Sequence, residues 1–242
     1  MAVTRRKLGV GVALAALAGA ASAGAVRRRA APVPGDRREL VFLVHGLGRT
    51  PVSMLLLARR LERQGFRAAS FGYWSTTGTI RGLSGTLARH VRAAVGDAPA
   101  VHFVGHSMGN IIIRGMLAEH RPERVGRVVM LAPPNQGSST ADRYARWIGW
   151  LMPHIHDLVT HPESTARTLR LPGDVDVGII AGLRDGKVQV AETHLEGARE
   201  HAVVPCRHTF IMNRRDVQGL ITGFLREGSF GLAAAQSGIA AG

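Results

Sequence analysis

The chain has 242 residues, of which 45% are hydrophobic and 20% are charged. This composition excludes a chain that is disordered as a whole, and the length suits one α/β domain. The formal net charge is +14, but no nucleic-acid recognition motif or aromatic-basic stripe accompanies it, so we expect no nucleic-acid partner. Contact of this basic chain with an anionic membrane surface or cell-wall polymer is a hypothesis.

The first 26 residues have the pattern of a secretory signal. A basic segment, Thr4-Arg5-Arg6-Lys7, precedes nineteen uncharged residues, Leu8–Val26, that are rich in Ala, Gly, Leu and Val and contain the small-residue segment Ala21-Ser22-Ala23. The paired arginines resemble a twin-arginine export signal, although Gly9 stands where a second bulky apolar residue is usual. We expect export to the periplasm or the extracellular space, with cleavage near Ala23; the alternative is a membrane anchor formed by residues 8–26, which is just long enough to span a bilayer.

Residues 27–38 follow as an expected linker, because they contain five arginines, Pro32, Pro34 and Gly35. After the linker, short apolar runs alternate with longer stretches of helical spacing. The expected strands are 40–44, 67–71, 101–104, 125–131, 177–181 and 201–204. The expected helices are 51–64, 79–95, 107–119 and 217–226.

This alternation predicts an α/β fold, with a mostly parallel sheet of about six strands and helices on both faces. We expect one domain over residues 39–230 and a flexible tail over 231–242. In such sheets, catalytic groups lie at the carboxyl ends of the strands, so candidate residues should follow strands.

Ser107 is the candidate nucleophile. It lies in Gly105-His106-Ser107-Met108-Gly109, directly after an apolar strand and before the helical run that contains Ile111-Ile112-Ile113. The G-x-S-x-G pattern in this context predicts a sharp strand-to-helix turn that exposes the serine hydroxyl, and the glycines leave room for its strained backbone.

Together with His45-Gly46-Leu47-Gly48 after the first strand, this motif resembles the α/β-hydrolase superfamily, and in particular small bacterial lipases and esterases. The segment Leu131–Ser138 also looks like that group, and the resemblance covers about residues 40–228. It implies an α/β-hydrolase fold. One departure is Asn110, where many relatives have glycine or alanine; we expect it not to impair Ser107.

The expected base is His208, which follows the last strand and fits the chain order Ser, acid, His of this fold. The segment Val-Pro-x-x-His-Thr-Phe-Ile-Met around it looks like the histidine loop of the superfamily. The expected acid is Asp185, three residues after Gly182 at the end of the penultimate strand, where it could fix the tautomer of the imidazole. Asp185-Gly186-Lys187-Val188 resembles the corresponding segment of the relatives.

Two backbone N–H groups usually stabilise the oxyanion of acyl transfer. One belongs to the residue after the nucleophile, Met108, and the resemblance places the other at Leu47. The expected function is therefore a serine hydrolase that cleaves small-molecule or lipid carboxylic esters through an acyl-enzyme. An acyltransferase or thioesterase on the same triad, and a non-catalytic binding protein on a hydrolase scaffold, remain alternatives.

Residues 138–171 contain no expected strand but an apolar cluster that includes Tyr144, Trp147, Trp150 and Leu151. This insert could form a lid or acyl-chain wall, with Trp147 and Trp150 as substrate-binding residues, or a helix that packs on the core. The spacing of His154, His156, Asp157 and His161 fits no standard zinc frame, so we expect no metal and no cofactor. Cys206, the single cysteine, is expected to be a small buried hydrophobe.

Overall fold

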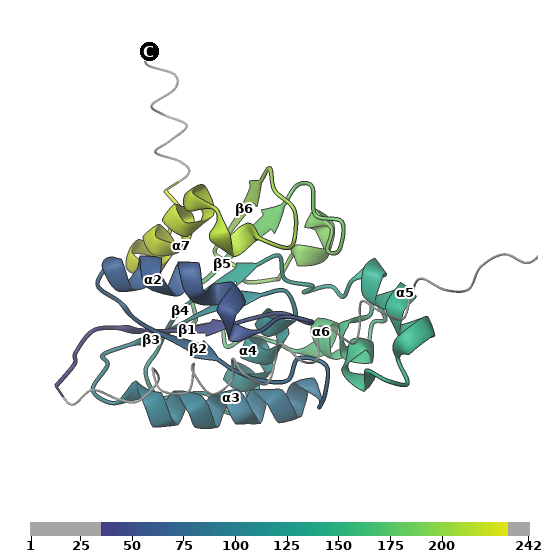
Figure 1. Ribbon diagram of the computed structural model, residues 1–242, viewed down its shortest axis with the longest axis horizontal. Coiled ribbons are helices and arrows are strands. Elements are labelled where there is room, and N and C mark those ends of the chain that lie inside the picture. Colours follow the sequence, from purple (N-terminus) through teal and green to yellow (C-terminus); the bar gives the residue numbers. More distant parts are fainter. Residues whose placement is uncertain (1–34, 232–242) are drawn as a thin grey trace, which may run out of the picture.

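The computed structural model describes residues 35–231, which form a parallel β-sheet between two layers of helices (Figure 1). The predicted signal or anchor, most of the predicted linker and nearly all of the predicted tail lie outside this range. Within it, no helix has the length and apolar character needed to cross a membrane.

Six strands make one sheet in the order β2-β1-β3-β4-β5-β6, and every neighbouring pair is parallel. The strands are β1 (Leu40–Val44), β2 (Arg67–Phe71), β3 (Val101–His106), β4 (Val125–Leu131), β5 (Val177–Gly182) and β6 (Glu200–Val204). The predicted fold class and number of strands are confirmed. β1, β3 and β5 are buried along their whole length, as expected for strands covered on both faces.

Two helices cover each face of the sheet. Figure 1 shows α2 (Leu55–Arg63) and α7 (Arg215–Glu227) on one face, and α3 (Ile80–Val95) and α4 (Met108–Glu119) on the other. Between β4 and β5 lie α5 (Ser139–Ile148), η3 (Pro153–Leu158) and α6 (Thr165–Thr168). The remaining short 3-10 turns are η2 (Pro51–Met54), η4 (Val190–Thr193) and η5 (Ile211–Asn213).

β1 shows how the sheet divides the core. Leu40, Phe42 and Val44 belong to the hydrophobic cluster under α3 and α4, whereas Val41 and Leu43 belong to the cluster under α2 and α7. This alternation follows from the two-residue period of a strand.

The register of the strands decides which loops meet. Val44 of β1 pairs with Gly105 of β3, and Gly182 of β5 pairs with Val204 of β6. Because parallel strands end at the same edge, the loops after β1 and β3 leave the sheet side by side, as do those after β5 and β6. All five predicted catalytic and oxyanion residues lie in these loops or at the start of α4.

Candidate active site

Ser107 occupies the turn between β3 and α4 in a conformation that side chains rarely adopt. Its φ is 52° and its ψ is −127°, and one other non-glycine residue of the described chain, Ala132, has a positive φ. Ser107 is also the single residue between 101 and 117 that is not fully buried. The strained turn therefore brings this hydroxyl out of an otherwise closed segment.

The glycines around Ser107 are needed for close packing. A Cβ at Gly105 would lie 2.2 Å from Oδ1 of Asn110, and a Cβ at Gly109 would lie 2.3 Å from the carbonyl oxygen of Val44. Gly46 lies against the nucleophile itself, since a Cβ there would be 3.0 Å from Cβ of Ser107. The two glycine motifs of the sequence thus meet at one point.

His208 and Asp185 form a buried pair. Nδ1 of His208 lies 2.7 Å from Oδ2 of Asp185, whose side chain is fully buried. The pairing of β5 with β6 continues beyond the strands, because Arg184 N–H donates to the carbonyl of Cys206 at 3.0 Å. This bond holds the two loops in register at the edge of the sheet.

The two oxygens of the Asp185 carboxylate have separate partners. Oδ1 accepts backbone N–H groups from Lys187 at 2.8 Å and Val188 at 3.0 Å, which leaves Oδ2 for His208. An ionised carboxylate can only accept, so Nδ1 of His208 carries the hydrogen and the lone pair lies on Nε2. This is the tautomer that a general base requires.

In the described part of the chain, Oγ of Ser107 and the His208 side chain are not hydrogen-bonded to each other. The turn that carries Ser107 and the loop that carries His208 are linked through His106 instead. Nε2 of His106 lies 3.0 Å from the backbone oxygen of His208, and the two rings are 4.8 Å apart. Burial holds the pKa of His106 well below its usual range, and the nearby His208 lowers this pKa further.

The backbone N–H groups of the two predicted oxyanion donors, Leu47 and Met108, are free to bind an oxyanion. In the loop after β1, the N–H of Gly48 donates to Ser75 Oγ at 3.0 Å and that of Arg49 to the carbonyl of Gly46 at 3.2 Å. The N–H of Leu47 has no acceptor among residues 35–231. Met108 is the first residue of α4, so its N–H has no acceptor within the helix.

Tyr73, which no sequence motif singles out, supports this loop. Its hydroxyl donates to the carbonyl of His45 at 2.5 Å, and the two rings stack with their centroids 4.2 Å apart. Burial raises the pKa of Tyr73 and lowers that of His45 to about 4, so both side chains are neutral at pH 7. They anchor the start of the His45–Gly48 loop.

Comparison with known families finds one match, to a family described as "Putative serine esterase (DUF676)", over residues 35–136. The matched region contains both glycine motifs and Ser107 but ends before Asp185 and His208. No curated protein matches the chain.

Similar solved structures include lipases and esterases. The mature lipase BlEst2 of Bacillus licheniformis is 18% identical, with a TM-score of 0.58 over 74% of this chain and 89% of the lipase. A structure of the metagenome-derived lipolytic enzymes LipS and LipT is 18% identical, with a TM-score of 0.63 over 78% of this chain and 94% of that chain. The esterase Pf2001 of Pyrococcus furiosus is 17% identical, with a TM-score of 0.55 over 78% and 82% of the two chains. The protein has the α/β-hydrolase fold.

Asn110 stands where many relatives are expected to have glycine or alanine, and its side chain is buried and hydrogen-bonded. It is fully buried, and its Nδ2 donates to the carbonyl of Ser107 at 3.0 Å and to that of Leu131 at 3.1 Å. Asn110 therefore ties the turn at Ser107 to the end of β4, a role that the sequence did not suggest.

The insert after β4 is attached to the hydrolase core by a buried arginine. Arg114 on α4 is 1% exposed and donates to Asn135 Oδ1 at 3.1 Å, to the carbonyl of Ala166 at 2.8 Å and to that of Leu169. Burial lowers the pKa of Arg114 to about 10, so the guanidinium keeps its charge at pH 7. These bonds fix α6 and its flanks against α4.

The core-packing alternative for the aromatic residues of the insert is wrong for the two tryptophans. Trp147 is 78% exposed and Trp150 is 82% exposed. Neither indole packs in the core, and their predicted role in substrate binding stays a prediction.

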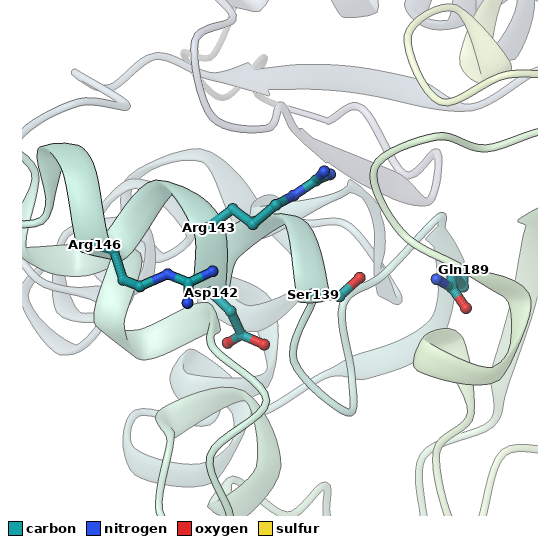
Figure 2. Close-up of a pocket in the computed structure, with 5 residues that line it drawn as sticks. All are labelled: Ser139, Asp142, Arg143, Arg146 and Gln189. Carbon is teal, nitrogen blue, oxygen red and sulfur yellow. The ribbon is translucent and has the colours of Figure 1, made fainter.

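A pocket of about 600 Å³ lies on α5, and Figure 2 shows the five residues that line it. They are Ser139, Asp142, Arg143, Arg146 and Gln189. None of the predicted catalytic or oxyanion residues is among them.

The histidines of the insert do not converge. His154 is buried and His156 is exposed, and no group of three His, Cys, Asp or Glu side chains within residues 35–231 is arranged to hold a metal ion. Cys206 is buried in the cluster under α7, which confirms its predicted place, and burial raises the pKa of its thiol.

Proposed function

We propose that the protein is a serine hydrolase that cleaves carboxylic esters of small molecules or lipids through an acyl-enzyme on Ser107. The observation that carries the proposal is the strained, partly exposed turn at Ser107, beside loops that hold a His208–Asp185 pair at 2.7 Å. The match to a serine esterase family and the fold shared with lipases and esterases support it.

In the first step, Nε2 of His208 takes the proton of the Ser107 hydroxyl as the oxygen attacks the ester carbonyl. Asp185 keeps the imidazole in the required tautomer and stabilises the cation that forms. The N–H groups of Leu47 and Met108 bind the oxyanion, and the amino-terminal dipole of α4 adds to this stabilisation. His208 then donates the proton to the leaving alcohol.

In the second step, water replaces the alcohol. His208 takes a proton from the water, whose oxygen attacks the acyl carbon, and the second oxyanion is held by the same two N–H groups. Its collapse breaks the bond to Ser107, which regains its proton, and the carboxylic acid leaves.

A fluorophosphonate probe tests the nucleophile directly. We expect the probe to label the wild-type protein and not Ser107→Ala, whereas Ser139→Ala, which removes an exposed serine of α5, should label like wild type. Absence of labelling of the wild type would contradict the enzyme proposal. Labelling that survives in Ser107→Ala would contradict the choice of nucleophile.

Product analysis separates ester hydrolysis from the two related activities. The protein is incubated with p-nitrophenyl esters of increasing acyl length, with a matched acyl thioester, and with an ester plus a primary alcohol. We expect free acid from the esters as the main product. A faster release from the thioester, or transfer of the acyl group to the alcohol, would assign the same Ser107 chemistry to a thioesterase or an acyltransferase.

The basic and apolar residues 4–26 further support the proposal that the protein is exported. Expression of the whole chain with N-terminal sequencing of the mature product tests this, and we expect a new terminus close after Ala23. An intact terminus in the membrane fraction would instead favour the anchor.

A further inference from the structure

We propose that the outer face of α5 docks onto the surface of an anionic phospholipid bilayer. This face is defined by Arg143, Arg146 and Trp147 on the helix and by Trp150 in the turn that follows it, with Tyr144 and Leu151 at its border. The inference stands apart from the catalytic proposal, because nothing in it requires Ser107 to react.

The spacing along α5 separates two faces. Ala141 is buried, and Ala145 and Ile148 pack against the core cluster, so the inner face follows the helical period in small and medium apolar residues. At 100° per residue, Arg143, Arg146 and Trp147 lie within an arc of about 100° on the opposite side, and Trp150 follows in the turn directly after the helix. The outward face of this helix is thus aromatic and basic, where a solvent-exposed face is ordinarily polar.

The exposure of the outer face is large. Trp147 is 78% exposed, Trp150 is 82% exposed, Leu151 is 56% exposed and Tyr144 is 51% exposed. In a chain that is 5% aromatic, such a group within eight residues forms a concentrated apolar patch in contact with water. Patches of this kind mark surfaces that bind a partner or a membrane.

The two arginines of the patch have no acidic partner within residues 35–231. Figure 2 shows both side chains extending from α5 over the pocket, with the carboxylate of Asp142 below Arg146. That carboxylate already accepts hydrogen bonds from N and Oγ1 of Thr160, at 2.9 and 2.8 Å. The guanidinium groups of Arg143 and Arg146 are therefore available to an external anion.

Indole rings and guanidinium groups together fit the headgroup layer of a bilayer. Tryptophan concentrates at this layer because its ring is apolar and its N–H is polar, and arginine pairs with lipid phosphates. Anionic headgroups add a surface potential that complements the charge of the patch. α5 follows the carboxyl end of β4, and Figure 1 shows it at that end of the sheet, so docking would turn the Ser107 edge toward the lipid.

The experiment measures binding to vesicles with the Ser107→Ala protein, so that no lipid is consumed. Sedimentation with phosphatidylcholine vesicles is compared with sedimentation with vesicles that also contain phosphatidylglycerol, and the emission of the tryptophans is recorded. We expect binding to the anionic vesicles with a blue shift of the emission, and much weaker binding to phosphatidylcholine alone.

Two variants probe the two halves of the face. Trp147→Ala/Trp150→Ala should abolish the blue shift and most of the binding. Arg143→Gln/Arg146→Gln should lower the partition onto anionic vesicles about 25-fold, at about fivefold per arginine, and remove the preference for phosphatidylglycerol. The matched control is Arg60→Gln/Arg63→Gln on α2, which removes the same charge from two exposed residues on a different helix and should bind like the parent.

Several outcomes would overturn the inference. Equal losses in the α2 control would assign the binding to net charge alone. Unchanged binding in both α5 variants would remove α5 from the interaction. A dimer on size exclusion that dissociates in Trp147→Ala/Trp150→Ala, with no vesicle binding by the parent, would assign the face to a second copy of the chain. Fluorophosphonate labelling of the wild type is scored separately, so the two proposals can fail independently.

Discussion

Nε2 of His106 lies 3.0 Å from the backbone carbonyl oxygen of His208, although 102 residues separate the two in the chain. A carbonyl only accepts, so Nε2 of His106 carries the hydrogen and its Nδ1 is bare. The residue before the proposed nucleophile thereby positions the loop that carries the proposed base. His106 acts through His208 and is a positioning residue.

Replacement of His106 tests this link. His106→Phe keeps a buried ring but loses the donor, and we expect kcat for a soluble ester to fall about 10- to 100-fold because the base is displaced. His106→Gln places an amide N–H near the position of Nε2 and should recover most of the rate. Steady-state kinetics with both variants check the prediction, and equal rates in the two would argue for a purely steric role.

Buried neutral histidines should make stability depend on pH. Burial lowers the pKa of His45 from 6.5 to about 4. Between these two pH values His45 is therefore protonated in the unfolded chain but neutral in the folded chain. The free energy of unfolding should therefore decline as the pH falls from 6.5 toward 4, by about 1.4 kcal/mol per pH unit for this one group.

Urea denaturation at pH 7.5, 6 and 5 measures this decline. His45→Gln cannot take up the proton and should show a shallower slope over the same interval, by about one proton. A slope that is identical in the variant and the wild type would show that His45 is not held neutral by the fold.

Removal of the carboxylate charge at Asp185 should impair catalysis far more than folding. We expect Asp185→Asn to lower kcat about 10³- to 10⁴-fold, because the amide no longer fixes the tautomer of His208 or stabilises its cation. The control is Asp216→Asn, which breaks a 2.6 Å ion pair with Arg214. Wild-type kcat in Asp185→Asn would exclude this aspartate as the acid.

The sequence predicted the sheet well because its strands carry a strong local signal. Leu40–Val44 is wholly apolar, and Val125–Leu131 is apolar apart from Gly126 and Arg127; the sequence predicts both strands at the residues where the structure has them. Ser107, Asp185 and His208 could be proposed as candidates for a related reason, since each follows a strand of the predicted parallel sheet and such strands end at the same edge; their catalytic role stays a prediction.

The insert was harder to predict because its large residues do not mark its buried face. α5 packs through Ala141, Ala145 and Ile148, whereas Trp147 and Trp150, which look like core residues in the sequence, point outward. Likewise, the bonds made by Asn110, Tyr73 and Arg114 join segments that are distant in the chain. No periodicity or motif signals such contacts.

Asn110 provides a sharp test of the support beneath Ser107. Asn110→Ala removes the Nδ2 donor from two buried carbonyls, those of Ser107 and Leu131, and should cost about 1 to 3 kcal/mol of unfolding free energy. Asn110→Asp has nearly the same shape but sets an oxygen against both carbonyls, so we expect it to be less stable than Asn110→Ala at pH 7. Chemical denaturation gives the order of the three proteins, and an Asp variant as stable as wild type would contradict the assigned bonds.

Gly46 tests the contact between the two glycine motifs. A methyl group there would lie 3.0 Å from Cβ of Ser107 and 3.0 Å from the carbonyl oxygen of His106, so Gly46→Ala should push the loop that carries the Leu47 N–H away from the nucleophile. We expect the rate of fluorophosphonate labelling to fall about 10²- to 10³-fold, the loss typical of a missing oxyanion donor. Gly186→Ala is the matched control, because a Cβ there meets no atom within 4 Å. If Gly46→Ala reacted as fast as Gly186→Ala, the loop after β1 would have no part in stabilising the oxyanion.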